Sequence, residues 1–308
     1  MHYALCTKKV RQFSERVKKE ILNQGFSNDS ESLAFLSAFA RVAGAFGFSG
    51  GQKTFEFKAD KEFIKIALHS ALEQLFRVEN LNFEILEKSI VFKGLAADEL
   101  LQNLKIFVEN SYGEMEYSLQ LADSFFTDNN IALSVLKAFF IGGGFITLVK
   151  GYHLEFAFSN GFLASDCIAL LKQFCNIVAK QITRAGKEVV YIKGQEQISE
   201  FLTSVGATDS MLNLENISAE RESAKLINRR LNCDMANIDK TVELAAKQIA
   251  KIENLQKSGK LATLSQKLIA AAELRLQHPE ASLDELAEKL FISKSGIRHR
   301  LQKLMEEI

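Results

Sequence analysis

The sequence lacks tryptophan, holds a single proline among its 308 residues, and carries no net charge. Its 38 basic residues balance its 38 acidic residues, so the overall charge indicates no attraction to nucleic acid, and any such binding has to be local. The lack of tryptophan points to no functional class. A hydrophobic content of 47% and this length predict two or more domains, each with its own core.

Cysteine is also scarce, and the cysteines that occur are scattered. None of them forms a CxxC pair, so the spacing argues against both a zinc site and a disulfide framework. We expect buried, reduced thiols in a cytoplasmic protein, with no metal and no cofactor. The four positions are Cys6, Cys167, Cys175 and Cys233.

Long apolar runs are missing as well. The first 13 residues, MHYALCTKKVRQF, lack the apolar core of a signal peptide. The most apolar stretch, residues 131–149, contains Lys137 and three consecutive glycines, which argues against a membrane span. We therefore expect a cytoplasmic, nucleoid-associated protein without a membrane partner.

An internal repeat organises the first two-thirds of the chain. Helices rich in small residues are predicted over 33–44 and 133–144, so their ends lie 100 positions apart. In each copy a strand, a helix, a strand pair and a closing helix follow. The first copy places them at 53–58, 61–76, 81–86 with 90–93, and 97–107; the second places them at 152–158, 165–178, 179–183 with 188–193, and 197–205. Each unit reads αββαββα, which predicts an α+β body with pseudo-two-fold symmetry.

Small residues end both leading helices and predict how they pack. They are Ala38, Ala43 and Gly44 in the first helix, and Ala138, Gly142, Gly143 and Gly144 in the second. Because small side chains let helix backbones approach, we expect the two helices side by side in the middle of a saddle. The alternative of a phosphate-binding glycine loop needs a strand before it and a helix after it, whereas the order here is reversed.

A helical connector is predicted after the repeats. Residues 214–259 lack proline and keep a helical period of apolar residues, with a break or cap expected at 237–239. Hinges are expected at 110–113 and 258–260. The predicted domains are 1–110, 111–213, 214–259 and 260–308.

The C-terminal residues have the pattern of a helix-turn-helix. A helix over 261–277 stops at His278-Pro279, and Ser282 with Glu285 forms a capping box for a second helix over 283–290. Phe291 and Ile292 fill the turn. Ser293 then caps a third helix that runs to Leu304. Three capped helices predict a small all-α domain.

The last helix divides into an apolar and a basic side. Ile297, Leu301 and Leu304 have core spacing, and no acid occurs from 293 to 304. Donors outside an apolar face suit phosphates and base edges. The alternative is a basic amphipathic helix with no DNA role. The candidate DNA-binding residues are Ser293, Lys294, Ser295, Arg298, His299, Arg300 and Lys303. Arg300 flanks the core face, so pairing with Glu285 or Glu288 is its alternative.

Distinctive segments are spread over nearly the whole chain, at 13–20, 151–156, 191–207, 228–241 and 278–304 and in the two leading helices, which we call the motif helices. In these segments the chain resembles the WhiA family, bacterial regulators of sporulation and cell division. The resemblance implies a LAGLIDADG homing-endonuclease-like saddle joined to the helix-turn-helix domain. It also implies a double-stranded DNA partner and a role in transcription regulation, the cell cycle and chromosome segregation.

Nucleases of this fold hold divalent metal with one acid at the end of each motif helix. The corresponding positions here are Ala43 and Gly143, and neither side chain binds a hard cation. No Asp or Glu occurs between Ser32 and Phe55, or between Ile131 and Leu154. We therefore expect no enzymatic activity. The alternative, a residual metal-dependent endonuclease, requires ligands from elsewhere in the chain.

The sheet face of the saddle leaves two further possibilities open. In nucleases of this fold that face lies in the major groove. The basic side chains on the face therefore either contact phosphate in this protein or are solvated residues at the strand ends. A third hypothesis makes the saddle a surface for other regulatory proteins, with minor DNA contact. The basic candidates are Lys53, Lys58, Lys93, Lys150, Arg184, Lys187 and Lys193.

Overall fold

The computed structural model describes residues 2–76, 82–109, 112–149 and 151–307, without the side chains of residues 2–11. The chain forms two compact units, residues 1–219 and 220–308. Among the described residues, no helix is both long and apolar enough to cross a membrane.

The first unit holds the two predicted repeats behind an N-terminal helix, α1 (His2–Asn23). The first repeat consists of α2 (Asp29–Ala43), β1 (Gly44–Ser49), β2 (Gln52–Lys58), α3 (Glu62–Phe76), β3 (Phe83–Ile85), β4 (Ser89–Lys93) and α4 (Leu95–Asn103). The second consists of α5 (Asn129–Gly143), β7 (Gly144–Thr147), β8 (His153–Phe158), α6 (Gly161–Cys175), β9 (Lys180–Arg184), β10 (Lys187–Lys193) and α7 (Gln195–Ser204). The αββαββα order is confirmed in both copies, and β1 and β7 are the strands to which the sequence analysis assigns no range.

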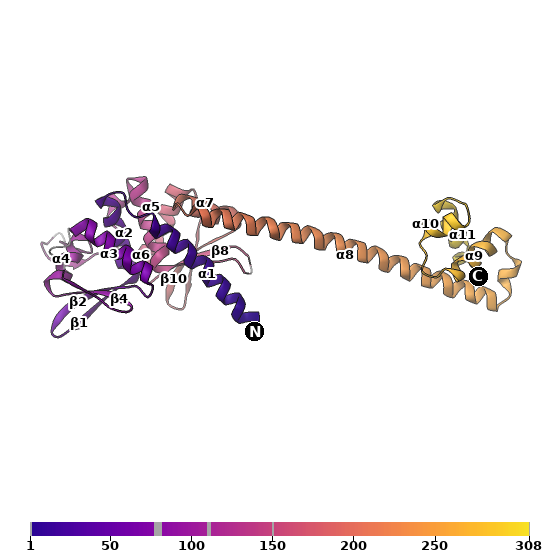
Figure 1. Ribbon diagram of the computed structural model, residues 1–308, viewed down its shortest axis with the longest axis horizontal. Coiled ribbons are helices and arrows are strands. Elements are labelled where there is room, and N and C mark those ends of the chain that lie inside the picture. The colour runs from indigo at the N-terminus through magenta and orange to yellow at the C-terminus, as the bar shows by residue number, and fades with distance from the viewer. Residues whose placement is uncertain (1, 77–81, 110–111, 150, 308) are drawn as a thin grey trace. The chain divides into compact units, whose positions relative to one another are not determined.

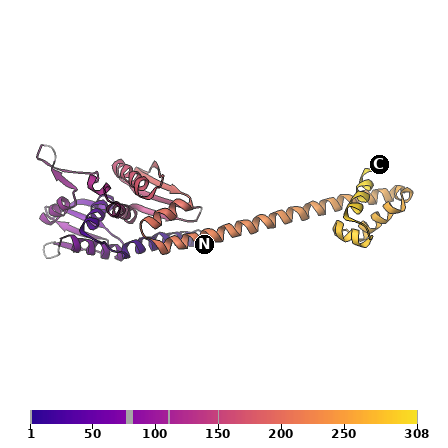
Figure 2. The ribbon, with the colours of Figure 1, turned by 90° about the horizontal axis from the view of Figure 1, so that it is seen from above.

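Each repeat forms one antiparallel four-stranded sheet with the same topology. The strand orders are β1-β2-β4-β3 and β7-β8-β10-β9. Figure 1 shows the helices on one side of the strands in this unit, and Figure 2 shows the two copies side by side. One hydrophobic core runs through both copies, so they form a single body.

The leading helices α2 and α5 pack against each other at the centre of this core, as predicted. A Cβ atom on Gly142 would lie 3.0 Å from Cγ1 of Val42, and one on Gly143 would lie 2.7 Å from the carbonyl oxygen of Ala157. There is therefore no room for a side chain at position 143, and only glycine fits there. Asn28 caps α2 by accepting from the Glu31 amide, and Asp128 caps α5 by accepting from two amides.

The prediction of a helix to residue 107 is wrong, because α4 ends at Asn103. Lys105 adopts a left-handed conformation with φ 54°, and the Ile106 amide donates to the Leu101 carbonyl. A left-handed residue together with such a hydrogen bond is a common way for a helix to end. The chain then forms β5 (Phe107–Glu109), which pairs with β6 (Met115–Tyr117). Residues 110 and 111 of the predicted hinge lie outside the described residues, and Gly113 lies between these two strands.

The connector is one continuous helix, α8 (Thr208–Lys257), which begins in the first unit and ends in the second (Figure 1). The predicted break at 237–239 is wrong. The hydroxyl of Thr241 donates to the Asn237 carbonyl within the helix. With no proline in the segment, its polar residues stay in helical geometry facing solvent.

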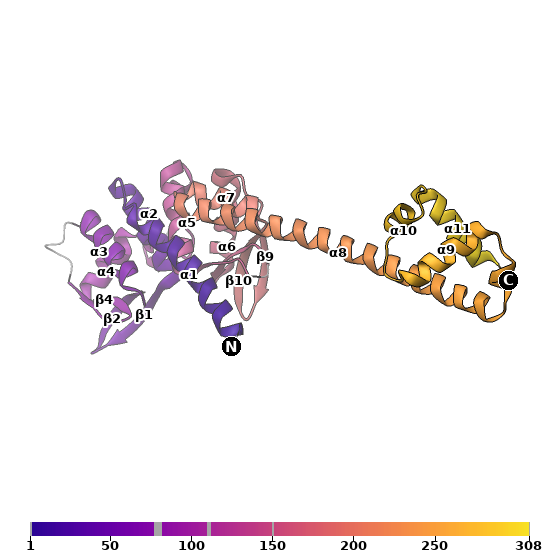
Figure 3. The same cartoon turned by 45° about the vertical axis from the view of Figure 1, so that its right-hand side comes forward.

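The second unit gathers three short helices at the end of α8 (Figure 3). They are α9 (Gln266–Gln277), α10 (Leu283–Lys289) and α11 (Lys294–Glu306). The expected helix over 261–277 starts late, because a 3-10 turn, η3 (Lys260–Thr263), precedes α9. Gly259 adopts φ 74° before that turn. Ile252 and Leu255 of α8 join the core of these helices.

Candidate nucleic-acid interface

The helix α10 begins with the predicted capping box. The Glu285 amide donates to the Ser282 hydroxyl at 3.3 Å, and the Ser282 amide donates to the Glu285 carboxylate at 2.7 Å. The Ser282 amide also lowers the pKa of Glu285. The first backbone amides of a helix have no hydrogen-bond acceptor within the helix. These two bonds supply acceptors for two of them and so fix where α10 begins.

The turn between α10 and α11 presents one aromatic side chain to solvent. Phe291 has φ 52° and is 96% exposed, so it does not fill the interior of the turn as expected. Its neighbour Ile292 packs on the core, and the Ile292 amide donates to the Ala287 carbonyl at 3.0 Å. The left-handed residue ends α10 sharply and leaves Phe291 outside.

The predicted apolar side anchors α11. Ser293 accepts from the Gly296 amide at 3.1 Å, which caps the helix. Ile297, Leu301 and Leu304 are at most 1% exposed and pack with Leu286, Ala271, Ala272 and the end of α8. The orientation of α11 is thereby fixed by its core side.

Arg275 is a structural residue that the sequence reading missed. It lies on α9, is only 2% exposed, and donates from Nη1 to the Ala281 carbonyl at 2.6 Å. Burial lowers the pKa of its guanidinium. This bond ties α9 to the segment that leads into α10. The available signal was the position of Arg275, which follows the apolar residues Ala271 and Ala272 by four and three residues.

The outer side of α11 carries the remaining candidate residues. Ser295, Arg298, His299 and Lys303 are exposed, and Arg300 is half-buried. No ion pair joins Arg300 to Glu285 or Glu288, all three of which the structure describes. Arg300 follows the buried Ile297 by three residues and precedes the buried Leu301, so it flanks the core side of α11.

Two candidates at the start of α11 are already engaged within the domain. The Lys294 ammonium lies 2.6 Å from a carboxylate oxygen of Asp284, on α10. The Ser293 hydroxyl caps the helix and lies 3.0 Å from the Ser295 hydroxyl. A phosphate at Lys294 would have to displace an exposed ion pair, whose stability is small.

A cation lies near the C-terminal end of each motif helix, at positions other than Ala43 and Gly143. Arg41, in the last turn of α2, donates to the Ser37 and Lys105 carbonyls. The Lys18 ammonium, from α1, donates to the Ile141 carbonyl near the end of α5 at 2.9 Å. Cations stabilise helix C-termini through the helix dipole.

Burial sets the acidity of both cations. It lowers the pKa of Lys18 to about 8 and that of Arg41 to about 10. No group of three or more His, Cys, Asp or Glu side chains in the described part of the chain could hold a metal ion.

Successive residues of a strand point to opposite faces of a sheet, and this alternation determines which face of the first sheet each basic residue occupies. Lys53 shares a face with the buried Phe55 and Phe57, so it lies on the helix-covered side. There its ammonium lies 3.8 Å from Asp98 and 5.9 Å from the centre of the Phe107 ring. Lys53 is therefore not on the face of the sheet that the helices leave uncovered, which we call the open face.

On the open face of the first sheet, Lys58 is exposed and Lys93 is paired. The Lys93 ammonium lies 2.7 Å from a Glu84 carboxylate oxygen. Glu56 lies on the same face by alternation, across from Val91. This face mixes acids and bases and has no basic stripe.

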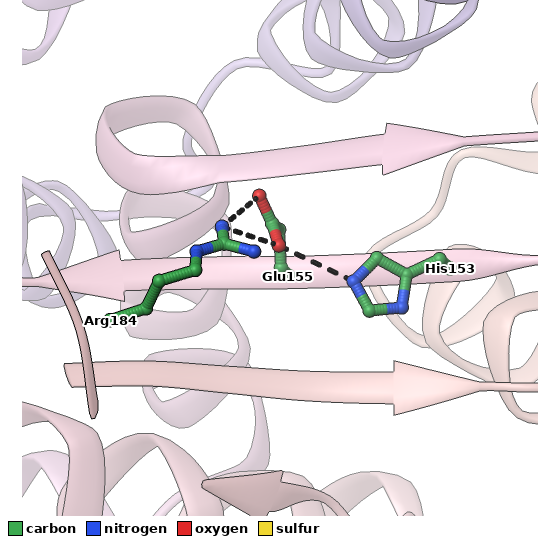
Figure 4. A network of polar contacts seen from close by, with 3 residues as sticks. All are labelled: His153, Glu155 and Arg184. Carbon is green, nitrogen blue, oxygen red and sulfur yellow. Dashed lines mark hydrogen bonds and ion pairs between the residues drawn. The ribbon is translucent and has the colours of Figure 1, made fainter. Parts of the chain in front are cut away.

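The second sheet carries a polar network across its open face (Figure 4). Glu155 lies 3.1 Å from the Arg184 guanidinium and 3.3 Å from the His153 ring. Lys193 lies over the Tyr191 ring at 5.3 Å. These residues line a shallow hollow of about 200 Å³. Lys187 is exposed on the same face, whereas Lys150 lies outside the described residues.

Comparison with known proteins matches both parts of the chain to one family. The family model for the WhiA LAGLIDADG-like domain matches residues 132–224, and that for the WhiA C-terminal HTH domain matches residues 227–307. A protein of Clostridium beijerinckii, "Probable cell division protein WhiA", is 33% identical over 95% of this chain and 96% of its own length.

The chain belongs to the WhiA family. A Clostridium novyi protein of the same name is 31% identical over 96% of this chain and 98% of its own length. The crystal structure of full-length WhiA from Thermatoga maritima matches with a TM-score of 0.55 at 25% identity, over 95% of this chain and 96% of that chain.

The WhiA family assignment agrees with the architecture of both units. It identifies the saddle as a LAGLIDADG-like fold and the three C-terminal helices as a helix-turn-helix region. The two family models meet within α8, between residues 224 and 227. The WhiA C-terminal domain thus includes most of the exposed part of α8 as well as the compact helices.

Proposed function

We propose that this WhiA-family chain binds double-stranded DNA in a sequence-specific manner through α11 and does not cleave it. In this proposal Arg298, His299 and Ser295 reach base edges, and Lys303 contacts backbone phosphate. Lys294 joins the phosphate contacts once Asp284 releases it. The cellular setting we propose is regulation of transcription linked to cell division, chromosome segregation and sporulation.

The observation that carries this proposal is the acid-free outer side of a helix whose inner side is fully anchored. A rigid helix loses little conformational freedom on entering a major groove, and uncompensated donors there can pair with base edges. In the described part of α11, the first acid is Glu306, at its last residue. Every donor from Ser295 to Lys303 thus lies on a stretch without a competing carboxylate.

The absence of cleavage is proposed from the motif helices. Ala43 and Gly143 offer no carboxylate, and Arg41 and Lys18 place positive charge at the helix ends. A metal-dependent nuclease needs the opposite charge pattern at this place. The alternative, a residual endonuclease, predicts plasmid nicking with magnesium or manganese that a chelator abolishes.

The test of DNA reading is a selection of duplexes from a random library. The wild-type chain is expected to enrich one sequence motif, because its base-edge donors discriminate between sites. Arg298→Ala is expected to retain duplex without enriching that motif. The matched control, Gln302→Ala, changes an exposed neutral neighbour and should enrich the wild-type motif. Failure of the wild-type chain to enrich any motif would contradict sequence-specific binding.

A further inference from the structure

The open faces of the two sheets of the saddle differ in charge, although the two copies of the repeat share one topology. On the open face of the first sheet, two lysines stand beside two glutamates within the described strands. On that of the second sheet, strand alternation places four cations and one carboxylate. The cations are Lys180, Arg184, Lys187 and Lys193, and the carboxylate is Glu155. Only the second copy therefore has a basic surplus, and we call its open face the second-sheet face.

The centre of the second-sheet face is apolar. Ile182 on β9 lies directly opposite Val189 on β10, and Tyr191 follows Val189 on the same face. Ile182 is 46% exposed, so this apolar centre is open to solvent. The three side chains line the shallow hollow of about 200 Å³ together with the polar network of Figure 4. The hollow has room for an apolar side chain of a partner.

The charge of the second-sheet face is concentrated around this centre. Lys180 lies opposite Tyr191 on the edge strand β9, whereas Lys187 and Lys193 lie at the two ends of β10. All three lysines are exposed, and none of them has a described ion pair. The single carboxylate, Glu155, is already compensated by Arg184 at 3.1 Å. The face thus combines an apolar hollow with a rim of uncompensated positive charge.

We propose that the second-sheet face binds an acidic peptide segment of another protein. In this arrangement an apolar side chain of the partner occupies the hollow between Ile182 and Tyr191, and neighbouring carboxylates pair with the surrounding lysines. An apolar anchor in a pocket with a polar rim is the usual construction of a protein interface. Opposite charges at the rim orient the partner and speed its association.

The extent and composition of the face favour a peptide over duplex DNA. A duplex along the saddle would pass both sheets, which share one hydrophobic core, yet the first sheet offers no basic surplus. Phosphates are bound by charged and hydrogen-bonding groups, so they would leave the apolar centre at Ile182 and Val189 unused. The seven residues of β10 make the face about 20 Å long, which a short extended segment spans.

The first test is a fluorescence-anisotropy titration of the full chain with a labelled peptide. The probe is a short peptide with one central phenylalanine flanked on both sides by glutamates. The comparison probe has glutamine in place of every glutamate. The acidic peptide is expected to bind on the order of tenfold more tightly, and added salt should reduce this difference. Equal affinity for the two peptides, or no binding of either, would overturn the proposal.

The second test locates the binding surface with a matched pair of charge reversals. Lys193→Glu should weaken binding of the acidic peptide about fivefold, because it sets a like charge beside the hollow. Lys58→Glu is the control, since Lys58 is also exposed without a described ion pair but lies on the first sheet. This variant should bind like the wild type. Equal weakening in both variants would show a response to overall charge and would overturn the site.

The apolar centre is tested separately by Ile182→Ser. This variant should weaken binding of the acidic peptide without changing its salt dependence, because it removes apolar contact and alters no charge. Since Ile182 is 46% exposed, the wild-type circular dichroism should be kept. Wild-type affinity of this variant would remove the hollow from the proposed contact.

A last comparison separates this site from the proposed DNA binding. Arg298→Ala should bind the acidic peptide like the wild type, because Arg298 lies on α11 in the other unit. Unlabelled duplex DNA should leave the labelled peptide bound to both chains. Displacement of the peptide by duplex from the wild type and from Arg298→Ala alike would assign the second-sheet face to nucleic acid and overturn the proposal.

Discussion

The basic residues of the saddle and those of α11 differ in what they contact. In the saddle, Lys53, Lys93 and Arg184 each lie within 4 Å of an acid, and Lys18 and Arg41 donate to buried carbonyls. On α11, the described ion pairs involve only Lys294. A basic residue that already pairs with an acid attracts phosphate less strongly. Among the basic candidates of the saddle that the structure describes, Lys58, Lys187 and Lys193 have no described ion pair. The comparison favours α11 over the saddle as the DNA-binding surface.

The largest expected effect concerns the saddle alone. Gly143→Leu should destabilise the first unit by on the order of 3 kcal/mol, because even a Cβ atom there would lie 3.0 Å from Cγ1 of Val42 on α2 and 2.7 Å from the Ala157 carbonyl oxygen on β8. Chemical unfolding followed by circular dichroism measures it. Gly161→Leu is the control, since a Cβ atom at Gly161 meets nothing within 4 Å. Equal stability of the two variants would contradict the close packing of α2 and α5.

A smaller effect is expected for the start of α10. Ser282→Ala removes the capping hydroxyl and should destabilise the second unit by about 1 kcal/mol. Thermal unfolding of the full chain measures the change. In the control, Ser258→Ala, the lost hydroxyl bonds the Leu255 carbonyl and caps no helix start. Unchanged unfolding of Ser282→Ala would show that the capping box does not position α10.

The dependence of stability on pH separates Lys18 from the exposed bases of α11. Burial lowers the pKa of Lys18 to about 8 from 10.5, so the unfolded chain binds more protons between these values. The contribution of Lys18 should make the first unit more stable as pH rises from about 8 to 10.5. Lys18→Met should lose this rise. A wild-type pH profile in Lys18→Met would contradict the burial of this charge.

The smallest effect is expected for a single phosphate contact. Lys303→Ala should weaken binding to every duplex alike, by less than 1 kcal/mol, and reduce the salt dependence by about one unit of slope. Duplex titrations at several salt concentrations measure both quantities. Gln302→Ala, which removes an exposed neutral neighbour, should change neither. A Lys303→Ala variant with the full wild-type slope would remove Lys303 from the contact surface.

The sequence predicted those parts of the fold that local signals encode. The repeat of small-residue helices predicted αββαββα twice, and Ser282 with Glu285 predicted the start of α10. The continuity of α8 was missed, because the polar residues Asn237 and Asp239 resemble a helix cap unless they are seen in helical geometry. The end of α4 was missed because Lys105, a left-handed non-glycine residue, carries no sequence signal.

The candidate site was predictable on its helix but not across the chain. The outer side of α11 follows from helical spacing and the caps. By contrast, the cations at the ends of α2 and α5 depend on contacts distant in sequence, such as Lys18 with Ile141. The pairing of Lys294 with Asp284 likewise depends on how two helices cross. The spacing of residues along the sequence does not predict these contacts between separate helices.

The most direct test of the central claim is a titration of wild-type and Arg298→Ala chains on the selected duplex and on a scrambled duplex. The account predicts that Arg298→Ala loses on the order of 1–3 kcal/mol on the selected duplex and little on the scrambled one. Arg298 lies exposed on the acid-free side of α11, so its loss should leave folding intact. Wild-type affinity of Arg298→Ala for the selected duplex would contradict the assignment of base reading to α11.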